Sequence, residues 1–158
     1  MNANPDVLRR ANARDACTLF LRLALAAAFL SAVADRFGLW GRPGAPGVAW
    51  GDFANFEAYT AILNWFLPHS WIPTLAWFDT ALEALLGLLL VLGFATRVTS
   101  LLSGVLLLLF ALAMTFSTGF ESALSYSVFS ASAGAFLLAF SGPYRCSLDN
   151  LLAARNRP

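Results

Sequence analysis

The feature that most constrains this chain is the apolar run at residues 72–95, because it contains two carboxylic acids, Asp79 and Glu83. About 20 apolar residues, each rising ~1.5 Å along a helix, match a hydrocarbon core ~30 Å thick. An acid in the middle of a bilayer costs roughly 2.5–3.5 kcal/mol, so two acids require polar partners. The two acids are four residues apart and share one helical face, which Gly87 continues. We predict a membrane span whose acidic face packs against a neighbouring helix.

The composition of the whole chain agrees with a membrane protein. Of its 158 residues, 59% are hydrophobic and 12% are charged, which is too little polar material to cover a soluble globule. The formal net charge of +1 provides no basic surface for a nucleic acid, so we expect membrane lipid and no nucleic acid as a partner. The predicted fold class is an all-α membrane protein, a bundle of four transmembrane helices.

Four apolar runs divide the chain. Residues 1–15 form a polar leader without a cleavage-site pattern, which we predict to be cytoplasmic. Residues 16–141 form the membrane domain, and residues 142–158 form a cytoplasmic tail with a short amphipathic helix that starts at an N-cap serine. The predicted spans within the membrane domain are residues 16–37, 72–95, 98–117 and 123–141.

The segment between the first two spans is predicted to lie outside the membrane core. Residues 38–51 are rich in glycine and proline and read as a loop. Residues 52–67 have apolar side chains every three or four positions, with Asp52 as N-cap and Pro68 as stop, which predicts a short amphipathic helix. This helix is either a lid on the bundle or one wall of the entrance for a lipid-soluble ligand. An aromatic belt at this membrane surface would contain Trp50, Trp65, Trp71 and Trp77.

The arginines predict the orientation, since the chain has no lysine. The side of the membrane that carries both termini would receive Arg9, Arg10, Arg14, Arg97, Arg145, Arg155 and Arg157. The other side has Arg36 and Arg42, nearly balanced by acids. The excess of positive charge marks the cytoplasmic side, so both termini are predicted to be cytoplasmic.

Depth in the membrane suggests two charge pairs. Arg22 would lie about 9 Å, and Glu83 about 18 Å, from the cytoplasmic face, a gap that a long arginine side chain can largely close. By the same count Asp79 lies about 24 Å and Arg36 about 30 Å from that face. We therefore predict an Arg22–Glu83 pair, direct or through one water, and an Arg36–Asp79 pair. Such pairs either fix the register of the helices or form a functional site.

The cysteines carry no recognisable chemistry. Cys17 and Cys146 are far apart and form neither a C-x-x-C motif nor a metal-ligand spacing, so we read them as two isolated thiols and predict no metal site. The chain also shows no haem ligand pair, iron–sulfur cysteine set, flavin fingerprint or catalytic triad. A self-sufficient enzyme is therefore not expected.

Three stretches, LFLRLAL at residues 19–25, EALLGLLLVLGFATR at 83–97 and GPYRCSLD at 142–149, resemble the DoxX family of small four-span bacterial membrane proteins. The resemblance covers about residues 19–152 and implies a four-helix bundle in the bacterial inner membrane. The chain departs from the family in its long Gly/Pro loop. The residues that match the family pattern are Arg22, Glu83, Gly87, Gly93, Arg97, Arg145 and Asp149.

The resemblance also implies a function, through the thiosulfate:quinone oxidoreductase subunits that gave the family its name. One hypothesis is a quinone-linked subunit of a membrane redox complex, in which Arg22 and Glu83 form a buried proton or oxygen-binding station. Quinone is then the only cofactor expected, and a partner subunit supplies the redox centre. Its ring would bind near Arg36 and Asp79 under the tryptophans, and His69 is an interfacial residue or a proton acceptor for the quinol. The alternative is a non-enzymatic accessory or assembly subunit, and either form can be a homo-oligomer.

Overall fold

The computed structural model describes residues 5–142 and 144–155, and the side chains of residues 5–11 lie outside the description. Arg157 and the side chains of Arg9 and Arg10, which entered the predicted charge asymmetry, therefore lie outside the described residues. Across the part that is described, the regular structure is helical throughout, and the all-α prediction is confirmed. The helices are α1 (Pro5–Arg36), α2 (Phe53–Leu63), η1 (His69–Trp71), α3 (Ile72–Leu92), α4 (Thr96–Ser117), α5 (Phe120–Ser125), α6 (Val128–Phe140) and α7 (Leu148–Arg155).

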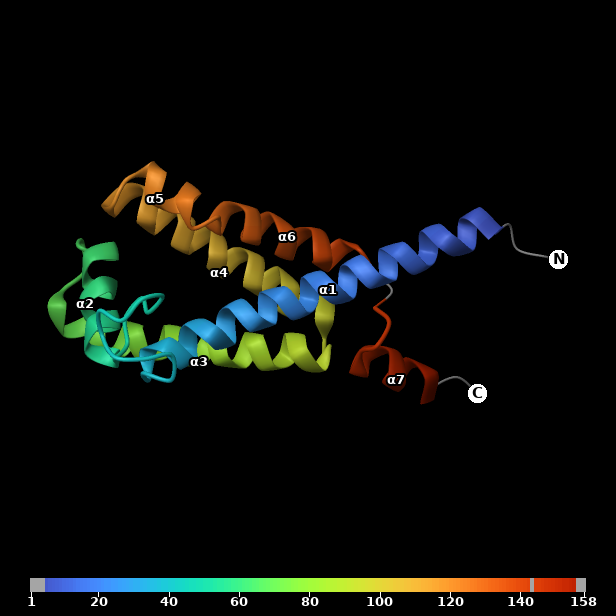
Figure 1. The fold of residues 1–158 in the computed structure, drawn as a ribbon, viewed down its shortest axis with the longest axis horizontal. Helices are drawn as coiled ribbons and strands as arrows, with labels where there is room; N and C mark the ends of the chain where they lie inside the picture. Colours follow the sequence, from blue (N-terminus) through green and yellow to red (C-terminus); the bar gives the residue numbers. More distant parts are fainter. Residues whose placement is uncertain (1–4, 143, 156–158) are drawn as a thin grey trace.

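Three helical segments are long and apolar enough to cross a membrane: Asn12–Arg36, His69–Leu92 and Thr96–Ser117. The chain is thus a multi-pass membrane protein. The helix α6 is also apolar but has 13 residues, or about 20 Å of rise. Figure 1 shows α1, α3, α4 and α6 running along a common axis, with both ends of the described chain at the same end of the bundle.

The predicted fourth span at residues 123–141 is not one unbroken helix, because the helix breaks inside it. Helix α5 ends at Ser125 and α6 starts at Val128, while Ser127 between them has a left-handed backbone with φ 55°. Serine hydroxyls compete for backbone hydrogen bonds and make serine a weak helix former, which favours a break among serines 122, 125 and 127. A hydropathy window does not register such a break, since the flanking residues are apolar.

The connection from α3 to α4 lies earlier than predicted, at residues 93–95 instead of 96–97. Helix α3 ends at Leu92, Gly93 takes a left-handed conformation with φ 65°, and α4 begins at Thr96. The amide of Phe94 donates to the carbonyl of Leu89 (3.1 Å), which satisfies a carbonyl at the helix end. Such a short turn makes α3 and α4 antiparallel neighbours, as the sequence predicted.

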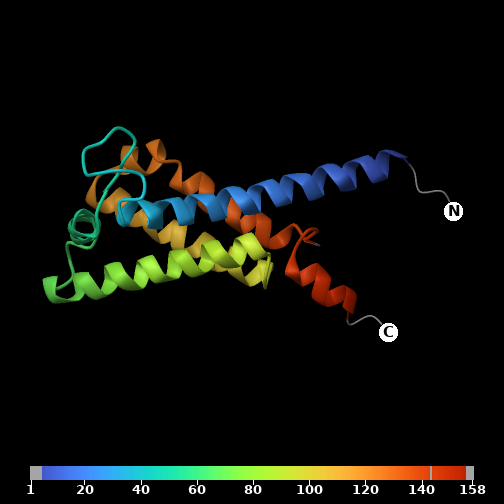
Figure 2. The ribbon, with the colours of Figure 1, turned by 60° about the horizontal axis from the view of Figure 1, so that its bottom comes forward.

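Helix α2 lies crosswise at the end of the bundle opposite the described termini (Figures 1 and 2). Its predicted N-cap is confirmed, because the Asp52 carboxylate accepts the amide of Asn55 (2.8 Å). The helix ends at Leu63, four residues before its predicted end at residue 67. The side chain of Asn64 donates to the carbonyl of Thr60 (3.0 Å) and competes with the continuing helix there.

The apolar core lies between α1, α3, α4 and α6, at mid-length of the bundle. Outside it, the long helices expose many leucines and valines, as helices facing lipid do. The core therefore separates the polar groups at the α2 end from those at the end with the termini. Its buried residues are Leu25, Ala26, Phe29, Leu86, Leu90, Leu106, Ala135 and Leu138.

Candidate functional site

One arginine joins both acids of α3 inside the protein. The Nη2 atom of Arg36 lies 2.7 Å from Oε2 of Glu83, to which it donates a hydrogen bond, and 3.6 Å from Oδ2 of Asp79. Its Nη1 atom donates to the hydroxyl of Thr80 (2.8 Å). Arg36 is 2% exposed, Glu83 3% and Asp79 8%. We call these four residues the arginine cluster; in it the predicted Arg36–Asp79 pair is confirmed.

The cluster forms where α1 ends against α3. Arg36 is the last residue of α1, where a cation also complements the helix dipole. Gly87, one turn beyond Glu83 on the same face, permits the close approach of the two helices, since an added Cβ there would lie 2.9 Å from Cγ of Leu30. Gly87 continues the acidic face of α3, and it serves there to let α1 and α3 pack closely.

An aromatic lid from α2 and the loop before it covers the arginine cluster. The guanidinium carbon of Arg36 lies 3.6 Å from the ring centre of Phe56 and 5.5 Å from that of Trp50. The two rings meet edge to face at 5.3 Å. A cation over aromatic rings in a desolvated place is stabilised by about 2 kcal/mol. At the arginine cluster α2 therefore acts as a lid on the bundle, which is one of the two roles that the sequence left open for it.

The loop before α2 is held by the neighbour of Arg36. One carboxylate oxygen of Asp35 accepts the backbone amides of Ala49 (3.0 Å) and Trp50 (2.8 Å). These two bonds fix the end of the Gly/Pro-rich loop beside α1 and place the indole of Trp50 near the guanidinium. Adjacent residues at the end of α1 thus have separate tasks: Asp35 anchors the loop and Arg36 organises the cluster.

The predicted Arg22–Glu83 pair is wrong. The Nη2 atom of Arg22 donates to the backbone carbonyl of Cys146 (2.6 Å), and Glu83 pairs with Arg36 instead. An added Cβ at Gly93 would lie 2.6 Å from Nη1 of Arg22, and Gly93 lies ten residues, or about 15 Å, along α3 from Glu83. The arginine side chain extends toward the end of the bundle that carries the termini, where it stays buried.

The other residues of the family-like pattern meet at the turn between α3 and α4. Asp149 accepts the backbone amides of Ala95 and Thr96, each at 2.7 Å, and its own amide donates to the carbonyl of Gly93 (3.1 Å). A carboxylate on free amides at the start of a helix is stabilising. We call the set that joins the tail to this turn the tail clasp, and it consists of Arg22, Gly93, Ser147 and Asp149.

Two further predicted residues lie beside the tail clasp. The Nε atom of Arg145 lies 2.8 Å from a carboxylate oxygen of Asp15 in α1. The guanidinium of Arg97 lies 5.6 Å from the ring centre of Phe140. The residues of the family-like pattern therefore lie in two separate places. Glu83 and Gly87 lie in the α2 half of the bundle, and the remaining residues lie at the opposite end.

Cys17 does not lie on the side of α1 that contacts the tail. Asp15 and Arg22 both contact the tail and lie seven residues apart on α1, on one side of the helix. Cys17 follows Asp15 by two residues and is rotated by about 200° from it, on the far side of α1. Cys17 and Cys146 are both free and exposed.

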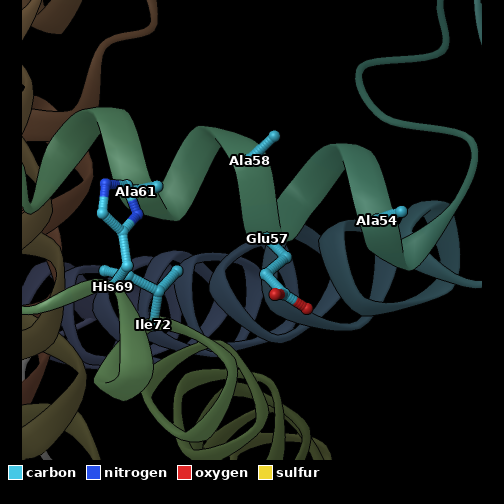
Figure 3. Close-up of a pocket in the computed structure, with 6 residues that line it drawn as sticks. All are labelled: Ala54, Glu57, Ala58, Ala61, His69 and Ile72. Carbon is cyan, nitrogen blue, oxygen red and sulfur yellow. The ribbon is translucent and has the colours of Figure 1, made fainter.

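A pocket lies beside the lid, between α2 and the start of α3. It has a volume of about 270 Å³. Figure 3 shows the imidazole of His69 next to Ala61 and Ile72, while the carboxylate of Glu57 lies further along α2. A second hollow of about 360 Å³ includes Ser70 and Trp71 among its lining residues and has a mostly apolar lining. The residues around the first pocket are Ala54, Glu57, Ala58, Ala61, His69 and Ile72.

The tryptophans predicted to roof the acids are distributed over three places. Trp50 covers Arg36, Trp71 lines the second hollow, and Trp77 stacks on Phe53 with ring centres 4.3 Å apart. Phe56, which covers the arginine cluster, was not among the site residues predicted from the sequence. Its contact with Arg36 depends on the path of the loop, for which no periodic signal exists.

The chain was compared with models of known families, with curated proteins and with solved structures, and none of the three comparisons gives a match.

Proposed function

We propose that the protein is a DoxX-like subunit of a redox complex in the bacterial inner membrane, and that it binds a quinone at the α2 end of the bundle. In this proposal α5 and α6 complete a fourth crossing, since residues 120–140 together rise about 30 Å. Four crossings put both termini on one side, and the arginines assign that side to the cytoplasm. A partner subunit supplies the redox centre.

The observation that carries the proposal is the pocket between α2 and α3. It combines an imidazole, His69, and a carboxylate, Glu57, with three small alanines. A quinone ring needs a narrow apolar slot with a few polar groups that bind its oxygens and exchange protons. The volume of about 270 Å³ is enough for a ring but not for an isoprenoid tail.

The second hollow provides a place for that tail. Its lining includes Ser70 and Trp71, the sequence neighbours of His69 and Ile72 in the first pocket. Its other residues are apolar or aromatic except Thr74, and Phe78 is exposed. In this arrangement the tail lies along the outside of α3, where lipid is expected.

The arginine cluster supports the pocket from behind. Phe56, which rests on Arg36, directly precedes Glu57 in α2. The cluster therefore fixes the position of the helix that supplies one wall of the pocket. In the proposed site Arg36, Asp79 and Glu83 position α2, whereas His69 and Glu57 contact the ring.

The proposal is tested by purifying the protein with its native partners and extracting bound quinone. We expect quinone with the wild-type protein and a large loss in the double variant His69→Ala, Glu57→Gln. Glu121→Gln removes an exposed acid of α5 and serves as the matched control, which should retain quinone. Absence of quinone from the wild type, or equal amounts in all variants, would reject a quinone site.

A non-enzymatic accessory or assembly subunit is the second candidate. The observation that favours it is the closure of the arginine cluster, since Arg36 is 2% exposed and cannot touch a ligand while Phe56 covers it. This candidate predicts that the partner complex fails to assemble without the protein, while the assembled complex turns over normally in the His69→Ala, Glu57→Gln variant.

A further inference from the structure

The charges of the arginine cluster do not balance. One guanidinium, that of Arg36, faces the carboxylates of both Asp79 and Glu83. Among the described residues, no other basic nitrogen lies within 4.0 Å of either carboxylate. With both acids ionised, the cluster would carry one uncompensated negative charge inside an apolar bundle. Such an unpaired charge is strongly unfavourable in a membrane.

The ionisable groups on the neighbouring elements do not supply the missing positive charge. Asp35 of α1 is bound to the loop amides. On α2, Glu57 lines the outer pocket and is itself an acid, and burial raises the pKa of Tyr59, which keeps its phenol neutral. His69 of η1 is exposed and lies on the pocket side. The remaining way to balance the cluster is a proton.

The contacts distinguish the two acids. Glu83 accepts a direct hydrogen bond from Arg36 at 2.7 Å, the distance of an ionised partner. Asp79 lies 3.6 Å from the same nitrogen, and no hydrogen bond to its side chain is found within the described part of the chain. The Nε atom of Arg36 is buried and has no acceptor. An ionised Asp79 would be expected to accept from such a free donor, and it does not.

We propose that the arginine cluster is a proton-binding site and that Asp79 carries the proton. Glu83 is the ionised partner of Arg36, and the pair is neutral. Asp79 lies one turn nearer to the α2 end than Glu83 and is the more exposed of the two acids, at 8% against 3%. Towards the other end, the route is closed by Leu86 and Leu90 of the apolar core. The proton therefore exchanges at the α2 end, whether or not a quinone binds there.

The experiment is infrared spectroscopy of the full chain in lipid nanodiscs near neutral pH, where a protonated carboxyl gives a C=O stretching band separate from the carboxylate bands. We expect the wild type to show this band, and ¹³C labelling of aspartate side-chain carboxyls to shift it, while ¹³C labelling of glutamate carboxyls leaves it in place. The band should vanish in Asp79→Asn. It should persist in Glu57→Gln, which removes an acid of the outer pocket as a matched control.

A second variant tests the charge count itself. In Glu83→Gln, Asp79 becomes the single acid facing Arg36, so it should ionise and the band should vanish although Asp79 is still present. The proposal is overturned by a wild type without the band, by a band that follows the glutamate label, or by a band that persists in Asp79→Asn or Glu83→Gln. If Glu83→Gln does not fold, the labelling of the wild type decides alone.

Discussion

Removing the guanidinium of Arg36 is the perturbation with the largest expected effect on stability. Arg36→Met keeps a long apolar side chain but deletes the hydrogen bonds to Glu83 and Thr80 and the contact with Phe56. Each hydrogen bond of the charged donor contributes about 1.5–3 kcal/mol, and the aromatic contact about 0.5–2 kcal/mol. Part of this is recovered because the unpaired Glu83 takes up a proton. We expect a net loss of about 3–5 kcal/mol.

The assay is reversible unfolding of the purified protein in mixed micelles, followed by circular dichroism. Arg42→Met is the matched control, because Arg42 is an exposed arginine of the following loop, and it should change stability by no more than about 0.5 kcal/mol. In a double-mutant cycle with Glu83→Gln, the two losses should be coupled by about 1–3 kcal/mol. A loss for Arg36→Met as small as that of the control would refute the buried arginine cluster.

Three further predictions concern the rest of the fold. Gly93→Ala should destabilise the protein by more than about 2 kcal/mol in the same assay, because the new Cβ adds a collision with Ser147 to the strained backbone. The control Gly119→Ala also has positive φ but open space around it, and it should cost about 1 kcal/mol. Equal costs for the two variants would contradict the tail clasp. Losses from Arg22→Leu and Glu83→Leu should be additive, since the two side chains have different partners, and a coupling above about 0.5 kcal/mol would contradict the assignment. A reporter fused to the C-terminus should be active in the cytoplasm, and periplasmic activity would mean an odd number of crossings.

Much of the fold follows from patterns that operate within one helix. The four-residue spacing of Asp79 and Glu83 predicted a shared buried face, and the position of Asp52 predicted the start of α2. The pairing of Arg36 with Asp79 followed from depth on adjacent helices, because the predicted depths of about 30 Å and about 24 Å are within reach of an arginine side chain. These signals are local, or depend only on counting ~1.5 Å per residue.

The wrong predictions concern features that cannot be obtained by counting residues along a helix. Depth places the Cα of Arg22 but not the direction of its side chain, which turned to the tail instead of Glu83. The left-handed Ser127 interrupts an apolar run without changing its hydropathy. The lid contact of Phe56 depends on loop amides held by Asp35, a tertiary arrangement with no sequence period.

The proposed quinone site at the α2 end of the bundle can be tested by photolabelling native membranes with an azido-quinone and mapping the labelled peptides. We expect labelling concentrated in residues 54–78, which contain the linings of both hollows, and suppression of this labelling by excess unmodified quinone. Labelling spread evenly along the lipid-facing side of α4, at exposed positions such as Leu102 and Leu109, and unaffected by competitor would contradict it.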